Sequence, residues 1–479
     1  MNMPKTIKSF RQLTDIILNS FRQLADLIPH PIEPLQSILA ARDKRAILKN
    51  QIALKSLPSL SLTLNIPGFP KSNPIIKAFF KICLRELKFT LKAHQIDFHE
   101  TESIEECDAA GDFYLVACSP DSLSLDQIKN VCENFEQEHS LGRFIDADLN
   151  DQNGASVTSG KLKLCFFCLE RPAIECRREN AHDHEELRSF MFPKMAAYSR
   201  QKEEVSLLKN LTALAQRSLL YEISLTPKPG LVDKFSNGSH QDMNYMTFIN
   251  SITAISPWFF ELVSEGFTFR DHDLTKALPL IRKIGLQMES AMFEATHHAN
   301  TQKGIIFLMG LSLFACGKLY SQSDLFNIEK FRYTISSICK DLVKKEMADN
   351  SRPDKSHGED IFHKYGFSGA RGEAESGFQT VFEFGLPQLT GAAELSDELM
   401  IKSFLAIASH NDDTNILYRS NPDVLSEFKK LCKNALVDFN DVNYSLVIDF
   451  CKNKNISPGG SADLLAVTIF VWSVMQTGH

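Results

Sequence analysis

The sequence predicts two domains of different fold class, an N-terminal α/β domain and a C-terminal all-α domain. The chain has 479 residues, which at roughly 100 to 200 residues per domain is too long for one core. Strand-like segments occur only before residue 193, whereas long segments of helical periodicity follow residue 207. We therefore predict an N-terminal helical extension (1–35), an α/β domain (36–192), a polar linker (193–207) and a helical domain (208–479).

The elements of the first domain are predicted to be short. Apolar residues at helical spacing indicate a helix over 13–28, which a proline cluster ends, and a second helix is expected over 37–55. Apolar and polar residues alternate over Leu60–Ile66, which predicts a half-buried strand closed by Pro67 and Gly68. Further strands are expected at Phe113–Ala117, Phe144–Leu149 and Leu162–Phe167.

The second domain is predicted to contain longer helices. They are expected at Lys209–Leu225, Tyr245–Leu262, Leu274–Ala295 and Ile305–Leu319. The longest apolar stretches are shorter than the ~20 residues that cross a bilayer, so we expect buried helices and no membrane contact. The N-terminal segment lacks a continuous apolar core, and the 11 scattered cysteines suit reduced thiols, which favours a cytoplasmic location.

Charge is unevenly distributed along the chain. The net charge of −7 is too small to indicate a polyanion-binding protein, so nucleic acid is not an expected partner. Residues 1–92 hold 15 Lys/Arg and 5 Asp/Glu, whereas residues 93–160 hold 2 and 15. Either these are solvated helices that differ in sign, or the basic part is a surface for an acidic or phosphorylated partner.

An acidic strand is the first candidate site. Asp146 and Asp148 alternate with apolar residues, so a strand places both carboxylates on one face, about 7 Å apart at the backbone. Two such carboxylates can bind Mg²⁺, which prefers oxygen ligands and substrate phosphates, and Arg143 can hold a phosphate. The alternative is an ordinary strand with a solvated acidic face.

A Cys/His cluster follows, made up of Cys165, Cys168, Cys176 and His182. Three thiols and an imidazole are the ligand set of a Cys₃His zinc site. Phe166 and Phe167 stand where a zinc knuckle usually has small turn residues, so buried free thiols are an equal alternative.

These motifs resemble those of a known family. Ala41-Arg42-Asp43-Lys44-Arg45, the segment 62–68, the segment 139–148 and the Cys/His cluster are similar, in that order, to the phosphoribosyl-dephospho-CoA transferase of citrate lyase, also called citrate lyase holo-acyl-carrier-protein synthase. The resemblance covers about residues 36–190 and implies a nucleotidyltransferase-like domain. It implies transfer of the citrate lyase prosthetic group to a serine of the acyl-carrier (gamma) subunit with release of pyrophosphate. A paired-Asp motif serves the metal in the similar malonate decarboxylase enzymes, which implies that role for Asp146 and Asp148.

Five polar loops between helices form the second candidate site. Glycines and helix starts in such loops can bind phosphate, and Ser461 is expected to cap a helix. One loop of this kind is an ordinary connection, but five on one domain indicate a ligand site. The predicted ligand-binding residues are Lys228, Gly230, His240, Asn300, Thr301, Lys303, Arg371, Asn415, Gly459, Gly460 and Ser461.

The loop series resembles triphosphoribosyl-dephospho-CoA synthase over residues 208–475. That family joins the ribose of ATP to the 2′-hydroxyl of 3′-dephospho-CoA and releases adenine. Gln302 departs from the family, since it stands where His is expected. Breaking the ribosyl–adenine bond passes through an oxocarbenium-like state that carboxylates stabilise. The candidate carboxylates, whose roles the sequence does not distinguish, are Glu222, Asp233, Asp242, Glu373 and Asp413.

The sequence thus predicts a bifunctional enzyme of citrate lyase prosthetic-group biosynthesis. Its expected partners are ATP, 3′-dephospho-CoA and the carrier protein. One alternative is the equivalent pair of activities serving malonate decarboxylase, against which the Cys/His cluster argues. A second alternative is a non-catalytic module that binds carrier protein, against which the paired aspartates and the loop series argue.

Overall fold

The structure, a computed structural model, describes residues 33–119, 123–322, 325–347 and 357–477. The chain forms two compact units and passes from one to the other between Val205 and Ser206. Each unit has a buried apolar core of its own. The helix predicted over 13–28 lies outside the described residues, as does nearly all of the predicted extension 1–35.

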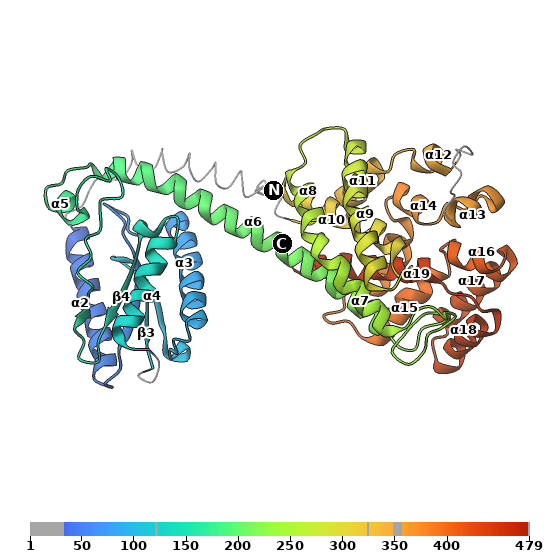
Figure 1. Ribbon diagram of the computed structural model, residues 1–479, viewed down its shortest axis with the longest axis horizontal. Helices are drawn as coiled ribbons and strands as arrows, with labels where there is room; N and C mark the ends of the chain where they lie inside the picture. The colour runs from blue at the N-terminus through green and yellow to red at the C-terminus, as the bar shows by residue number, and fades with distance from the viewer. Residues whose placement is uncertain (1–32, 120–122, 323–324, 348–356, 478–479) are drawn as a thin grey trace, which may run out of the picture. The chain divides into compact units, whose positions relative to one another are not determined.

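The first unit contains a five-stranded antiparallel sheet with helices against it (Figure 1). The strands lie in the order β2 (Ile104–Asp108), β3 (Gly111–Ala117), β1 (Ser59–Leu64), β4 (Ile145–Asn150) and β5 (Ser156–Val157). The strands predicted near residues 60, 113 and 144 are confirmed as β1, β3 and β4. All adjacent strands pair antiparallel, so the region is a small antiparallel sheet with helices.

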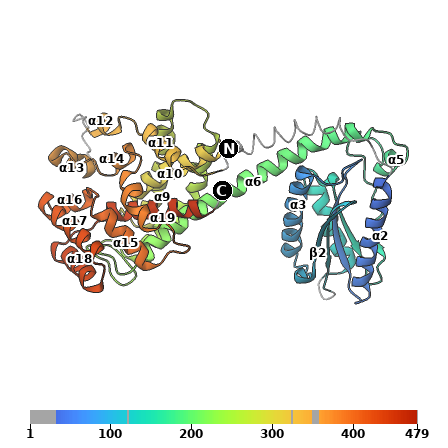
Figure 2. The same ribbon diagram turned by 180° about the vertical axis from the view of Figure 1, so that it is seen from behind.

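Helices cover both faces of this sheet. Helix α2 (Glu33–Ala53) lies on one side, and α3 (Pro74–Ala93) and α4 (Leu125–Glu138) lie on the other (Figures 1 and 2). The Asn73 side chain accepts a hydrogen bond from the Ile76 amide and Pro74 fixes the first turn of α3, which explains where that helix begins. Leu62 and Ala147 belong to the core beneath α3 and α4.

The strand predicted at Leu162–Phe167 is wrong. This segment is irregular, and only a single bridge joins Leu164 to Pro172. The Cys165 amide donates to Arg171 O and the Leu169 amide donates to Cys165 O, so the chain turns back on itself here. The alternating leucines do not form a buried face, since Leu162 is 78% exposed.

In its described residues the second unit is helical. Helix α6 (His184–Ser224) crosses the boundary between the units, and the segment predicted as a linker, 193–207, lies within it. The apolar segment predicted over 245–262 is two helices, because Pro257 interrupts it. The helices after α6 are α7 (Tyr245–Ile255), α8 (Phe259–Thr268), α9 (Ala277–Ala295), α10 (Lys303–Tyr320), α11 (Ile328–Ile338), α12 (Leu342–Met347), α13 (His357–Tyr365), α14 (Gly369–Glu375), α15 (Asp397–Ala408), α16 (Thr414–Arg419), α17 (Pro422–Val437), α18 (Asp441–Lys454) and α19 (Gly459–Gln476).

Helices α10 and α19 form the centre of the second core. By length and composition both could cross a membrane, but 78% and 72% of their apolar windows are buried inside this unit. They are the buried helices that the sequence predicts. Gly266 and Gly317 let α8 and α10 approach closely, since a Cβ atom at either position would overlap a backbone carbonyl of the other helix. This close approach packs the C-terminal half of α10 against α8.

Candidate functional site

A cavity of about 230 Å³ in the second unit brings the predicted loops together. Its walls come from the ends of helices that are far apart in the sequence. The predicted residues that line it are Glu222, Lys228, His240, Asn300, Thr301, Lys303, Glu373, Asp413, Asn415, Gly459 and Gly460. Gly230, Asp233, Asp242, Arg371 and Ser461 do not line it.

Two long helices start at this cavity. Lys303 and Gly304 are the first residues of α10, and Gly459 and Gly460 are the first residues of α19. The N-cap residue of neither helix makes a side-chain hydrogen bond. The Lys303 amide donates to Asn300 Oδ1 and the Ser461 amide donates to Asp413, so the other amides of the two first turns are the ones that can bind a ligand. Two positive helix ends at one cavity suit a polyanion such as a triphosphate.

The loop after α6 contains an ion pair and an organising carboxylate. Lys228 Nζ lies 2.6 Å from Glu222 Oε1 and both side chains are almost fully buried. Asp233 accepts hydrogen bonds from the amides of Lys228 (3.0 Å), Phe235 (2.9 Å) and Ser236 (2.8 Å). Asp233 therefore holds the turn that presents Lys228.

Gly230 also has a structural part in this loop. Its φ of +65° favours glycine, and a Cβ atom there would overlap the carbonyl oxygen of Ile456. The loop is thus held against the segment that precedes α19.

His240 lies between Ser457 and Arg419. Its Nε2 is 2.9 Å from Ser457 Oγ, and its Nδ1 is 3.3 Å from Arg419 Nη2. Burial and the adjacent Arg419 charge lower the pKa of His240, so the ring is neutral at pH 7. Asp242 contributes little here, since its side chain is 62% exposed and 3.9 Å from His240.

Asp413 connects two of the loops. It caps α16 by accepting from the Asn415 amide, and its second oxygen accepts from the amide (2.8 Å) and hydroxyl (2.9 Å) of Ser461. Ser461 is therefore not the N-cap that the sequence predicts, since α19 begins at Gly459 and Ser461 lies in its first turn. Burial raises the pKa of Asp413.

Two residues of α14 point to different environments. Glu373 lines the cavity and accepts hydrogen bonds from the Thr380 amide and hydroxyl, and burial raises its pKa. Arg371 instead donates to Glu346 (3.1 Å) and lies 3.9 Å from Glu359. Arg419, which sequence reasoning did not select, lines the cavity.

Gln302 occupies the position where the resembling family has His. Its side chain is buried and accepts a 2.6 Å hydrogen bond from Ser251 Oγ, which in turn accepts from Thr301 (2.8 Å). The amide therefore fixes the turn that opens α10.

Sequence reasoning also missed Asp463. It is the fifth residue of α19, lines the cavity, and is so close to α10 that a Cβ atom on Gly304 would overlap its carboxylate. Burial, with the charges of Glu222 and Asp413, raises the pKa of Asp463 well above its usual value. No hydrogen bond or ion pair holds this carboxylate within the part of the chain that the structure describes. Its position one helical turn after the Gly459-Gly460 pair is the sequence feature that could have identified Asp463 as a cavity residue.

The first unit contains the acidic strand. Asp146 and Asp148 occupy alternate, partly exposed positions of β4, opposite Thr63 and Ser61 of β1. Burial and the Asp148 charge raise the pKa of Asp146. Lys49 of α2 faces the same pair: burial lowers its pKa while both aspartates oppose that shift.

Basic residues next to this strand are already engaged. Arg143 donates twice to the carbonyl oxygen of Leu164, at 3.1 and 2.5 Å. Lys163 Nζ pairs with Glu136 and lies 3.5 Å from Asp146 Oδ1. The segment 163–164 therefore contacts the acidic strand through two side chains.

Comparison with known proteins gives two family matches in chain order. Residues 33–198 match the family model of the apo-citrate lyase phosphoribosyl-dephospho-CoA transferase, and residues 208–479 match that of the ATP:dephospho-CoA triphosphoribosyl transferase. Protein CitXG of Leuconostoc mesenteroides subsp. cremoris is 31% identical over 91% of this chain and 96% of its own length. Protein CitXG of Haemophilus influenzae is 29% identical over 92% of this chain and 96% of its own length. The 2-(5″-triphosphoribosyl)-3′-dephosphocoenzyme-A synthase of Pectobacterium atrosepticum is 38% identical over 56% of this chain and 90% of its own length.

Proposed function

The chain belongs to the ATP:dephospho-CoA triphosphoribosyl transferase family, fused to an apo-citrate lyase phosphoribosyl-dephospho-CoA transferase region, and from this we infer that it is a bifunctional transferase. It acts in the biosynthesis of the citrate lyase prosthetic group. The second unit makes triphosphoribosyl-dephospho-CoA from ATP and 3′-dephospho-CoA, and the first unit transfers the phosphoribosyl-dephospho-CoA group to the carrier protein. The observation that carries the assignment is the pair of family matches in one chain.

The function is tested with the full chain in two steps. ATP and 3′-dephospho-CoA are added first, and free adenine is measured by chromatography. Apo-carrier protein of citrate lyase is then added, and its mass gain is measured. Adenine release excludes the non-catalytic binding module, and loading of citrate lyase carrier in preference to malonate decarboxylase carrier excludes the other alternative.

The cavity of the second unit binds the triphosphate of ATP. A ligand with up to four negative charges needs several donors held together, and the first turns of α10 and α19 provide amides at one place. Lys303 and Arg419 add charge at the wall of the cavity. Lys303 is 53% exposed and pairs with Glu289 across 3.0 Å, so it can turn toward a bound phosphate.

The carboxylates of the cavity differ in what they are free to do. Glu222 is neutralised by Lys228, and Asp413 is occupied by amides and a hydroxyl, so both position their neighbours. Asp463 is the carboxylate with no such partner among the described residues. A positive charge nearby favours the ionised form of such a buried carboxyl group, so Asp463 can ionise against the positive charge that develops on the ribose as adenine leaves and stabilise it.

The acidic strand is the transfer site of the first unit. The two carboxylates lie on one face and the Asp148 charge raises the pKa of Asp146, so a divalent cation between them would relieve their repulsion. Asp146 and Asp148 would hold Mg²⁺, which neutralises charge on the departing pyrophosphate. Lys49 and Lys163 lie beside the pair and contribute positive charge for the phosphates. The antiparallel sheet with this paired-Asp strand supports a nucleotidyltransferase-like site.

Separate cores lead to a prediction about separate activities. A fragment of residues 206–479 should release adenine from ATP and 3′-dephospho-CoA at a rate comparable to that of the full chain, because its core and its cavity both lie within it. The fragment should not load carrier protein. A fragment that is folded by circular dichroism but inert, beside an active full chain, would show that the two regions share one active site.

A further inference from the structure

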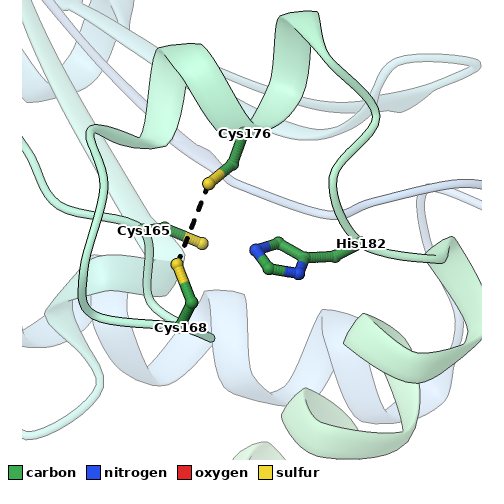
Figure 3. A group of neighbouring side chains, drawn as sticks. All are labelled: Cys165, Cys168, Cys176 and His182. Atoms are coloured by element: carbon green, nitrogen blue, oxygen red, sulfur yellow. Dashed lines mark hydrogen bonds between the residues drawn. The ribbon is translucent and has the colours of Figure 1, made fainter.

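The Cys/His cluster has the geometry of a metal site. Its four donor atoms lie within 4.8 Å of one another, although the residues come from a turn, a short helix and a loop (Figure 3). The sulfurs of Cys168 and Cys176 are 3.8 Å apart. Zn–S bonds of about 2.3 Å in a tetrahedron place two sulfurs roughly 3.8 Å apart, whereas a disulfide needs about 2.05 Å. The spacing fits one shared ion.

The histidine agrees with this geometry. Figure 3 shows one ring nitrogen of His182 directed at the three sulfurs. His182 Nε2 is buried and has no nitrogen or oxygen partner in the described part of the chain. A buried imidazole nitrogen that is directed at sulfur atoms alone has the environment of a metal ligand.

The phenylalanines between the first two cysteines do not oppose a metal. The Phe166 ring packs against Phe144 and Phe190, with ring centroids 5.2 Å and 6.2 Å apart. It therefore attaches the turn to the core of the first unit. Phe167 packs edge-on against His182 at 5.0 Å. These rings fix the turn and shield the imidazole, which small turn residues would not do.

A second group with donor atoms equally close, Cys83, Glu86 and His139, does not compete as a metal site. The Glu86 carboxylate is 2.6 Å from Lys202 Nζ and accepts hydrogen bonds from Tyr198. Its negative charge is already compensated. Arg171 interacts with the Cys176 sulfur of the Cys/His cluster, but it is itself paired with Glu179 at 2.8 Å.

The cluster also adjoins the proposed transfer site. Lys163 and Leu164 come directly before Cys165, and they are the residues that contact Asp146 and Arg143. Between residues 158 and 183 the only helix is α5 (Ala173–Arg178), so few backbone bonds hold this segment in place. Metal binding commonly supplies the folding free energy of such short, irregular segments.

We propose that the Cys/His cluster binds one structural Zn²⁺, which fixes the segment 163–164 beside the acidic strand and so positions Lys163 and Arg143. All four ligand positions belong to the protein, which is the arrangement of a structural and not a catalytic zinc. The positioning role rests on the proposed function, whereas the zinc content does not.

The first test is elemental analysis of the full chain purified without chelator. About one zinc per chain is expected. Cys176→Ser should lose the zinc, whereas Cys107→Ser, which changes an exposed cysteine of β2 outside the cluster, should keep it. After exchange, cobalt(II) should give cobalt–thiolate absorption in the parent chain and in Cys107→Ser only. A metal-free chain that is folded and active would overturn the zinc site in favour of free thiols.

The second test concerns positioning. Cys176→Ser should load carrier at least roughly tenfold more slowly, while adenine release by the other unit stays unchanged. His182→Cys offers four thiolates and should restore both zinc and loading relative to His182→Ala, which guards against a simple folding defect. If zinc is lost and loading stays normal, the positioning role is wrong although the metal site stands. If the parent chain neither releases adenine nor loads carrier protein, the proposed function is wrong.

Discussion

Asp148→Asn is expected to slow carrier loading by about 10²-fold or more, the size of effect seen when a group that stabilises developing charge is removed. Asp148 lies on the same face of β4 as Asp146, and the substitution removes one of two negative charges without changing side-chain size. Loading is measured by the mass of the carrier after addition of pre-made triphosphoribosyl-dephospho-CoA. Adenine release should remain at the level of the parent chain, because it belongs to the other unit.

The stability of the first unit distinguishes this role from a structural one. The Asp148 charge raises the pKa of Asp146, so removing that charge should leave the temperature of thermal unfolding of Asp148→Asn unchanged or higher. Glu105→Gln, which removes an exposed carboxylate from the edge strand β2, is the matched control and should load normally. Normal loading by Asp148→Asn would mean that β4 is an ordinary strand with a solvated acidic face.

The strands that sequence reasoning identified are those with a buried face. The apolar residues that alternate with polar ones in β1 and β4 are those buried against α3 and α4, so the alternation predicts the strands. Strand β2, Ile-Glu-Glu-Cys-Asp, has almost no apolar residue because it is an edge strand, and it was missed. The segment Leu162–Phe167 has a strand-like pattern, but the hydrogen bonds of the cysteine turn determine its conformation.

For the cavity, the sequence identified the loops but not the direction of each side chain. Arg371 was selected for its chemistry, yet Glu346 and Glu359 hold it away from the cavity. Arg419 reaches the cavity because it ends α16, whose start is fixed by Asp413. These outcomes depend on contacts between residues distant in the sequence, and no local pattern records them.

Asp463→Asn is expected to slow adenine release by about 10²-fold, because the neutral amide cannot stabilise positive charge on the ribose. The substitution keeps the size of the side chain, and Asp463 has no hydrogen-bond or ion-pair partner among the described residues that the change would break. Adenine is measured by chromatography with ATP and 3′-dephospho-CoA at saturating concentrations. Carrier loading from pre-made precursor should be unchanged.

Stability again separates chemistry from structure for Asp463. Burial and two neighbouring carboxylates raise the pKa of Asp463 in the folded state, so ionising Asp463 opposes folding. The free energy of unfolding of the parent chain therefore falls as pH rises above the pKa of the unfolded state, which is about 3.9. Asp463→Asn avoids this cost, so its melting temperature should equal or exceed that of the parent, with the larger difference at pH 8 than at pH 5. Asp449→Asn, an exposed carboxylate of α18, should change neither activity nor stability. A lower melting temperature of Asp463→Asn with a proportional loss of adenine release would show that Asp463 is a structural residue. Unchanged adenine release would show that another carboxylate, Glu222 or Glu373, stabilises the charge on the ribose.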